Sequence, residues 1–144
     1  MDKRKFIAKE LSKTNNLIRR NWQKCELKKQ MDDATGRNGW IIGFLADNDD
    51  REIFQRDIED EFSIRRSTVS SMIQLMEKKG FVTRESVDYD ARLKKLVLTP
   101  KAREMNSKML STLEKSEEKL REGISSEELE LFFSILEKIQ KNAE

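Results

Sequence analysis

The most constraining feature of this sequence is a change of hydrophobic spacing at Gly80. Before it, apolar residues recur at intervals of three or four, which predicts a helix over about residues 66–79. The expected buried face of this helix consists of Val69, Met72, Ile73 and Met76. After Gly80, residues 81–85 and 95–98 resemble two strands joined by a turn at 88–91. Because glycine often ends a helix, the sequence predicts a helix that leads directly into a β-hairpin.

The segments before this unit are predicted to form three helices. The first spans about residues 3–29, and the second starts near 35–36 and stops at the polar run 47–50. A short helix follows over 55–62, after a very short strand at 53–54. Two short helices, over 55–62 and 66–79, therefore precede the hairpin.

Two long helices are predicted after the hairpin. Thr99 is the expected N-cap of the first, with Pro100 at its first helical position, and Gly123 ends it. Ser125 and Glu128 form the capping box of the last helix. The predicted fold class is mainly α with a small β-hairpin. The apolar faces of the terminal helices can pack on each other or on a second copy of the chain, and we predict a homodimer.

The composition excludes several classes of protein. The 144 residues are 39% charged and 36% hydrophobic, which is typical of a single helix-rich domain. No apolar run could cross a bilayer and the N-terminus lacks a signal peptide, so we expect a cytoplasmic protein. With no histidine and only Cys25, His-dependent triads and the usual zinc sites are excluded. We expect no enzyme activity, no cofactor and no metal.

Positive charge is concentrated around the predicted hairpin. Residues 63–103 contain ten Lys and Arg against four Asp and Glu, a net charge of +6, whereas the whole chain carries +2. Phosphate binding favours such a local excess of cations. The charge distribution therefore supports a nucleic-acid partner.

The helix over 66–79 has a polar face suited to base edges. This face carries hydroxyls, one amide and one guanidinium, and no acid before Glu77. Its members are Arg66, Ser67, Thr68, Ser70, Ser71 and Gln74. A helix fits the major groove of B-DNA, and a hairpin can reach the adjacent backbone or minor groove. Arg92 and Lys94 lie near the hairpin tip, where Asp90 could brace Arg92.

These motifs together resemble the MarR family of bacterial regulators. Its motifs lie in residues 63–82 and 88–102, and the resemblance extends over about residues 55–102. The tail 123–129 looks like the SlyA branch of that family. It implies a winged helix-turn-helix lobe over 51–101 within one MarR-type domain, with dimerisation helices at 1–34 and 102–144. The implied DNA-binding residues are Arg65, Arg66, Ser67, Thr68, Ser70, Ser71, Gln74, Asp90, Arg92 and Lys94.

The resemblance also implies a function. A homodimer would bind double-stranded DNA at a pseudo-palindromic operator, repress transcription, and release DNA when a small phenolic or other anionic effector binds. The sequence does not identify residues that bind an effector. Three positions depart from the family pattern: Arg65 replaces a usual N-cap, Glu59 often corresponds to alanine, and Ala91 replaces a frequent basic residue.

Two alternatives remain at this stage. One is a winged-helix adaptor or anti-repressor that binds protein and no longer binds DNA. The other is a redox-sensing regulator that uses Cys25, although no sensor motif surrounds this residue and inert packing explains it more simply.

Overall fold

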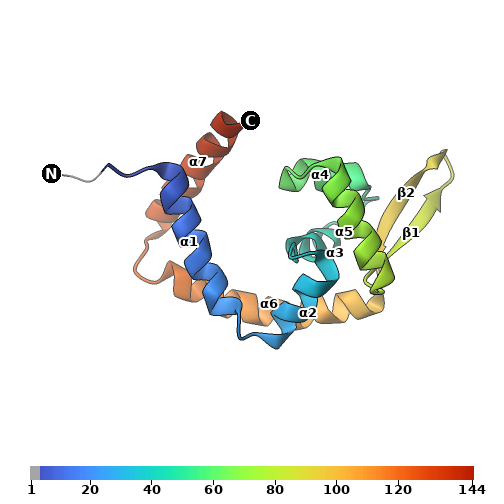
Figure 1. Cartoon of the computed structure of the whole chain (residues 1–144), viewed down its shortest axis with the longest axis horizontal. Coiled ribbons are helices and arrows are strands. Elements are labelled where there is room, and N and C mark those ends of the chain that lie inside the picture. The colour runs from blue at the N-terminus through green and yellow to red at the C-terminus, as the bar shows by residue number, and fades with distance from the viewer. Residues whose placement is uncertain (1–3) are drawn as a thin grey trace. The chain divides into compact units, whose positions relative to one another are not determined.

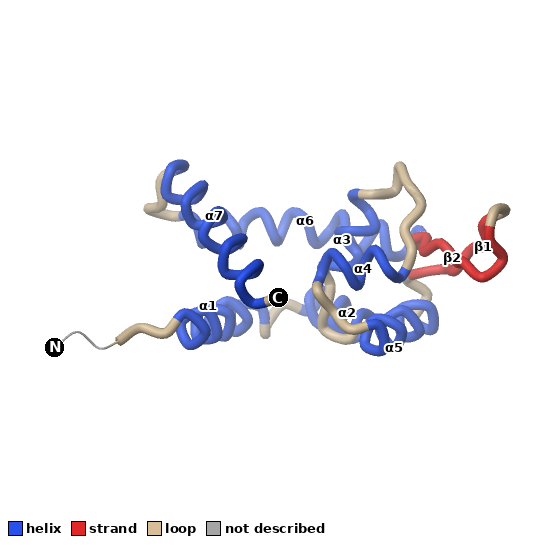
Figure 2. The backbone as a smooth tube through the Cα atoms, turned by 90° about the horizontal axis from the view of Figure 1, so that it is seen from above, coloured by secondary structure: helices blue, strands red, loops and turns tan. Residues whose placement is uncertain are grey.

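The computed structural model describes residues 4–144, which form seven helices and one two-stranded hairpin (Figure 1). The mainly helical fold class predicted from the sequence is confirmed. Figure 2 separates the helices from the two strands by colour. The elements are α1 (Ile7–Trp22), α2 (Glu26–Thr35), α3 (Trp40–Asp47), α4 (Gln55–Phe62), α5 (Arg66–Lys78), β1 (Val82–Val87), β2 (Asp90–Leu98), α6 (Pro100–Arg121) and α7 (Ser126–Ala143).

The chain divides into two compact units, Met1–Met109 and Leu110–Glu144. The first unit contains α1 to α5, the hairpin and the beginning of α6. The second contains the rest of α6 and all of α7. None of the helices within residues 4–144 combines the length and apolar character needed to cross a membrane.

The core of the first unit joins α3, α4, α5 and the hairpin. Ile41, Ile42, Ile58 and Ile73 have no exposed surface, and Phe81 at the start of the hairpin is 4% exposed. Burying an aliphatic side chain of this size contributes roughly 1.5–3 kcal/mol. The four predicted inward residues of α5 are all buried, so this helix is held by one complete apolar face.

The hairpin is antiparallel, with Val82 opposite Leu98 and an irregularity between Ser86 and Val87. Leu96 N–H donates a hydrogen bond to the carbonyl of Ile53 at 2.7 Å. The very short strand expected at 53–54 is therefore reduced to this one hydrogen bond. It attaches the hairpin to the loop that precedes α4.

The N-terminal helices differ from the prediction. The expected helix over 3–29 is interrupted at residues 23–25, where Cys25 has an extended backbone (φ −85°, ψ 109°). The apolar spacing continues on both sides of the break, so periodicity did not reveal it. The next helix begins at Trp40 instead of about 35, because Gly36 and Arg37 both have left-handed φ values, 63° and 72°, and end α2.

The predicted caps of the last two helices are confirmed. The Thr99 hydroxyl accepts a hydrogen bond from Ala102 N–H at 3.3 Å and donates one to the Gly80 carbonyl at 2.6 Å. It thus connects the start of α6 to the end of α5. At α7, Ser125 and Glu128 form the reciprocal capping box.

Candidate nucleic-acid interface

The polar face of α5 lies opposite its buried face. Arg66, Ser67, Thr68, Ser71 and Gln74 are exposed, as the sequence predicted, whereas Ser70 is half-buried. The apolar side chains of α5 are buried in the first unit, so its hydroxyls and guanidinium face outward. This arrangement presents donors and acceptors without a competing acid before Glu77.

The turn into α5 lacks a side-chain cap. Arg65 is the N-cap residue and its side chain accepts no hydrogen bond, which agrees with its departure from the usual Ser or Thr. Ser63 has a left-handed backbone (φ 49°) and ends α4, so it does not replace the missing cap. The first N–H groups of α5 therefore remain available to an external acceptor such as a phosphate oxygen.

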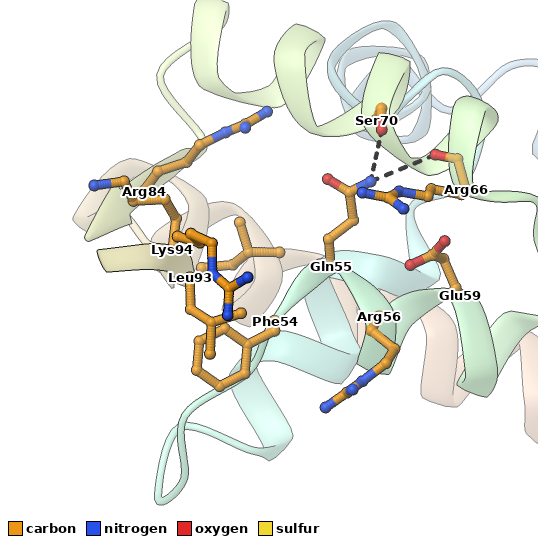
Figure 3. A pocket seen from close by; sticks show the side chains of 11 residues that line it. Phe54, Gln55, Arg56, Glu59, Arg66, Ser70, Arg84, Leu93 and Lys94 are labelled. Atoms are coloured by element: carbon orange, nitrogen blue, oxygen red, sulfur yellow. Dashed lines mark hydrogen bonds between the residues drawn. The ribbon is translucent and has the colours of Figure 1, made fainter. Parts of the chain in front are cut away.

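A side chain that the sequence analysis missed fixes α4 against α5. Gln55 Nε2 donates to Ser70 Oγ at 2.6 Å and lies 3.4 Å from the Arg66 carbonyl oxygen (Figure 3). These contacts explain why Ser70 is less exposed than the other hydroxyls of its face. Gln55 is the first residue of α4, and the sequence offered no signal that it reaches across to the next helix.

A groove of about 570 Å³ lies between the helices and the hairpin. Gln55, Arg66 and Ser70 are on one side, and Arg84, Leu93 and Lys94 are on the other (Figure 3). Its lining includes five cationic side chains and one carboxylate: Arg56, Arg66, Arg84, Arg92, Lys94 and Glu59. Such an excess of positive charge attracts a polyanion.

The groove brings together some predicted residues and adds others. Of the predicted set, only Arg66, Ser70, Arg92 and Lys94 line it. Arg56 and Arg84 were missed, although strand alternation and hairpin pairing could have placed Arg84 near Lys94. Arg84 Nε lies 3.5 Å from Glu77 Oε2 at the end of α5, and this ion pair links the hairpin to that helix. Arg84 thus adds a cation to the hairpin side of the groove.

Glu59 does not prevent the two short helices from packing. Ile58, its neighbour, is completely buried and supplies the apolar contact, while Glu59 is half-buried and lines the groove. In Figure 3 its carboxylate lies on the side of Arg66. Its negative charge reduces the net charge of the groove without altering the fold.

The predicted brace between Asp90 and Arg92 is present. Asp90 Oδ1 accepts a hydrogen bond from Arg92 N–H at 2.9 Å and lies 3.3 Å from Arg92 Nε. The Arg92 side chain is 91% exposed, so the brace directs a guanidinium that remains free to bind a ligand. The backbone hydrogen bond, followed by the side-chain contact, lowers the pKa of Asp90 below its ordinary value.

A second contact holds the hairpin tip. The Tyr89 hydroxyl donates to Glu52 Oε2 at 2.5 Å, across to the loop before α4. This hydrogen bond to a carboxylate is the main reason that the pKa of Tyr89 is raised. The tip is therefore tied to the body of the first unit beside Arg92.

The comparisons with known proteins agree with this geometry. A sequence profile of the MarR family matches residues 33–93. The transcription regulator MarR from Oenococcus oeni PSU-1 is 30% identical, and the match covers 94% of this chain and 99% of that one, with a TM-score of 0.78. The chain belongs to the MarR family. It is therefore a winged-helix, DNA-binding transcription regulator, and this family membership confirms the prediction that it is not an enzyme.

Two further solved structures show the same fold. The S. aureus MepR–DNA complex is 22% identical, covers 96% of this chain and 99% of that one, and has a TM-score of 0.81. A putative MarR family regulator from Listeria monocytogenes, complexed with 26mer DNA, is 19% identical. The match covers 96% of this chain and 89% of that one, with a TM-score of 0.77. The SlyA branch stays a prediction.

The causes of the Asp90 shift can be separated experimentally. Substitution Arg92→Ala removes the side-chain contact but keeps the larger cause, the backbone N–H, so most of the lowering of the Asp90 pKa should remain. Carboxyl NMR titration of wild type and variant, with the urea-unfolded chain as reference, measures this. The pKa of Asp90 is lower in the folded chain than in the unfolded one. Its carboxylate therefore stabilises the folded state at a pH above the unfolded pKa, and this stabilisation is lost as the pH falls through the folded pKa. An Asp90 that titrates as in the unfolded chain would contradict the observed brace.

Proposed function

We propose that the chain acts as a homodimeric repressor that binds a pseudo-palindromic operator and is released by a small anionic effector. The observation that supports DNA docking best is the groove in which Arg66 of α5 and Arg92 of the hairpin line one cationic surface. In this proposal α5 enters the major groove and Arg92 reaches the adjacent minor groove. The regulator would act in the bacterial cytoplasm, where its operator lies.

The predicted DNA-binding residues take different roles in this proposal. Arg66 and the exposed hydroxyls and amide of α5 read base edges or bind nearby phosphates. Arg65 and Lys94 bind phosphates, and Asp90 positions Arg92. Arg56 and Arg84 join them as phosphate contacts because they line the same groove. The DNA complexes of MepR and of the Listeria regulator support DNA as the partner by analogy of fold.

The dimer is supported by apolar surface left uncovered in each unit. No residue of α1 or α7 is buried. Leu131, Phe132, Phe133 and Ile135 of α7 are each at least 45% exposed, and Ile7 of α1 is 60% exposed. Exposed apolar residues that share one helix are costly in water and are typical of an interface. We infer that a second copy covers these terminal helices.

Two alternatives are less well supported. An adaptor that had abandoned DNA would have no need for the acid-free polar face of α5 or for the braced Arg92. A redox switch would use Cys25, which is half-buried beside the first turn of α2 and has no second cysteine to pair with in this chain. Repression by effector-controlled DNA binding therefore remains the function we propose.

Removing either groove arginine should weaken operator binding. We expect Arg66→Ala and Arg92→Ala each to cost roughly 1–3 kcal/mol in binding free energy, because each loses a charged contact to DNA. The operator is first selected from a random duplex library, and affinities are then measured by fluorescence anisotropy over a salt series. Arg51→Ala is the matched control, since Arg51 belongs to the same unit but does not line the groove. Wild-type affinity in both groove variants would overturn the proposed docking.

Charge placed on the apolar face of α7 should separate the dimer. The chain mass is 17.0 kDa, and we expect sedimentation to give twice this mass for wild type. The double variant Leu131→Glu, Phe132→Glu should have the mass of a single chain. Lys138→Glu also puts an acid on the exposed surface of α7 but removes no apolar side chain, and it should remain dimeric. A monomeric wild type, or a fully dimeric double variant, would contradict the proposed interface.

A further inference from the structure

A second cationic pocket lies in the first unit, outside the groove described above. It has a volume of about 560 Å³ and is formed by the end of α1, by α2 and by the residue that follows Gly36. Its charged lining residues are Arg19, Arg20, Lys28, Lys29, Arg37 and Asp32. Pockets of this volume accommodate small molecules. Five cations against one carboxylate give it a positively charged lining, which favours an anion.

Most of this positive charge has no counterion. Lys28 forms an ion pair with Asp32. For Arg19, Arg20, Lys29 and Arg37 no ion pair occurs within residues 4–144. Four like charges around one cavity repel one another, and a bound anion would remove that repulsion. Arginine is also the side chain best suited to bidentate contact with a phosphate.

The backbone of Arg37 supports a ligand-binding role. Its φ of 72° is in the left-handed region, which glycine or asparagine adopts at lower cost. The position is held by a hydrogen bond from Arg37 N–H to the Asp32 carbonyl at 2.9 Å. Strained residues of this kind concentrate at binding sites, and this one lines the pocket.

The pocket also adjoins the helix that carries the proposed base contacts. α2 packs on α5, and its residues Met31, Ala34 and Thr35 are buried. A Cβ placed on Gly36 would lie 3.5 Å from Met72 Cγ of α5. An anion held by Arg37 would therefore lie at the end of a helix that packs on α5. Any effect of that anion on operator affinity rests on the proposed function, but its binding does not.

We propose that this pocket binds a phosphate-type oxyanion with at least two negative charges. The group can belong to a free phosphorylated molecule or to a DNA backbone, since the recognition chemistry is the same. Trp22 also lines the pocket and is half-buried, so its fluorescence should report occupancy.

The test uses inorganic pyrophosphate and the full chain. Trp40→Phe leaves Trp22 as the only tryptophan, and Trp40 is 67% exposed and does not line the pocket. At constant ionic strength, pyrophosphate should change Trp22 emission with saturation. In this background Arg37→Asn, which suits the left-handed backbone, and Arg20→Gln should each weaken binding at least about tenfold. Lys24→Gln removes an exposed cation from the same connection but outside the pocket, and should stay within about twofold.

The outcomes are decisive for the pocket. The proposal would be overturned if pyrophosphate bound equally well to Arg37→Asn, Arg20→Gln and Lys24→Gln. It would also be overturned if pyrophosphate did not bind at all, which is the result expected if carboxylates of a second copy fill the pocket. If circular dichroism shows that Arg37→Asn does not fold, Arg20→Gln alone decides.

A second experiment measures the affinity of wild type and the pocket variants for a fluorescent random duplex over a salt series. A smaller salt slope in the pocket variants assigns the phosphate to DNA, and an unchanged slope assigns it to a free molecule. No operator is used, so failure of the proposed repressor function would leave this result unaffected.

Discussion

The proposed interface depends on the burial of one face of α5. Ile73 and Met76 have no exposed surface, and Val69 and Met72 complete the contact with the core. Because these side chains fix the rotation of the helix about its axis, the opposite face must present Arg66 and its hydroxyls to solvent. The same core holds Phe81 at the base of the hairpin, so α5 and the hairpin are held in a fixed position relative to each other. Binding residues on two elements can therefore meet one ligand without a large cost in ordering.

Electrostatics adds specificity to this scaffold. Arg92 is braced by Asp90 and Arg84 by Glu77, so each guanidinium loses less freedom when it binds a phosphate. Neither of these two carboxylates lines the groove. Glu59 is the exception, since it lines the groove itself and lowers its net charge.

Much of the fold could be predicted from short-range patterns. The bounds of α4, the buried face of α5 and the caps at Thr99 and Ser125 follow from apolar spacing and local hydrogen bonding, which act within a few residues. The break at Cys25 was missed because the apolar stripe continues past it. The left-handed pair Gly36 and Arg37 was missed because it requires a non-glycine residue, Arg37, at positive φ. Gln55 and Arg84 were missed for another reason. Hairpin pairing could have placed Arg84 beside Lys94. The contacts of Gln55 with Ser70 and of Arg84 with Glu77, however, join different elements, and only the tertiary structure brings these partners together.

The central claim is that α5 occupies the major groove while Arg92 reaches the minor groove. Dimethyl sulfate footprinting tests it directly, because the reagent methylates guanine N7 in the major groove and adenine N3 in the minor groove. On the selected operator, wild type should protect guanine N7 in two segments about 10 base pairs apart, with adenine N3 protected beside each. Arg92→Ala, at saturating protein, should lose the adenine protection and keep that of guanine. Adenine protection that persists in this variant, or guanines that remain reactive under wild type, would contradict the account.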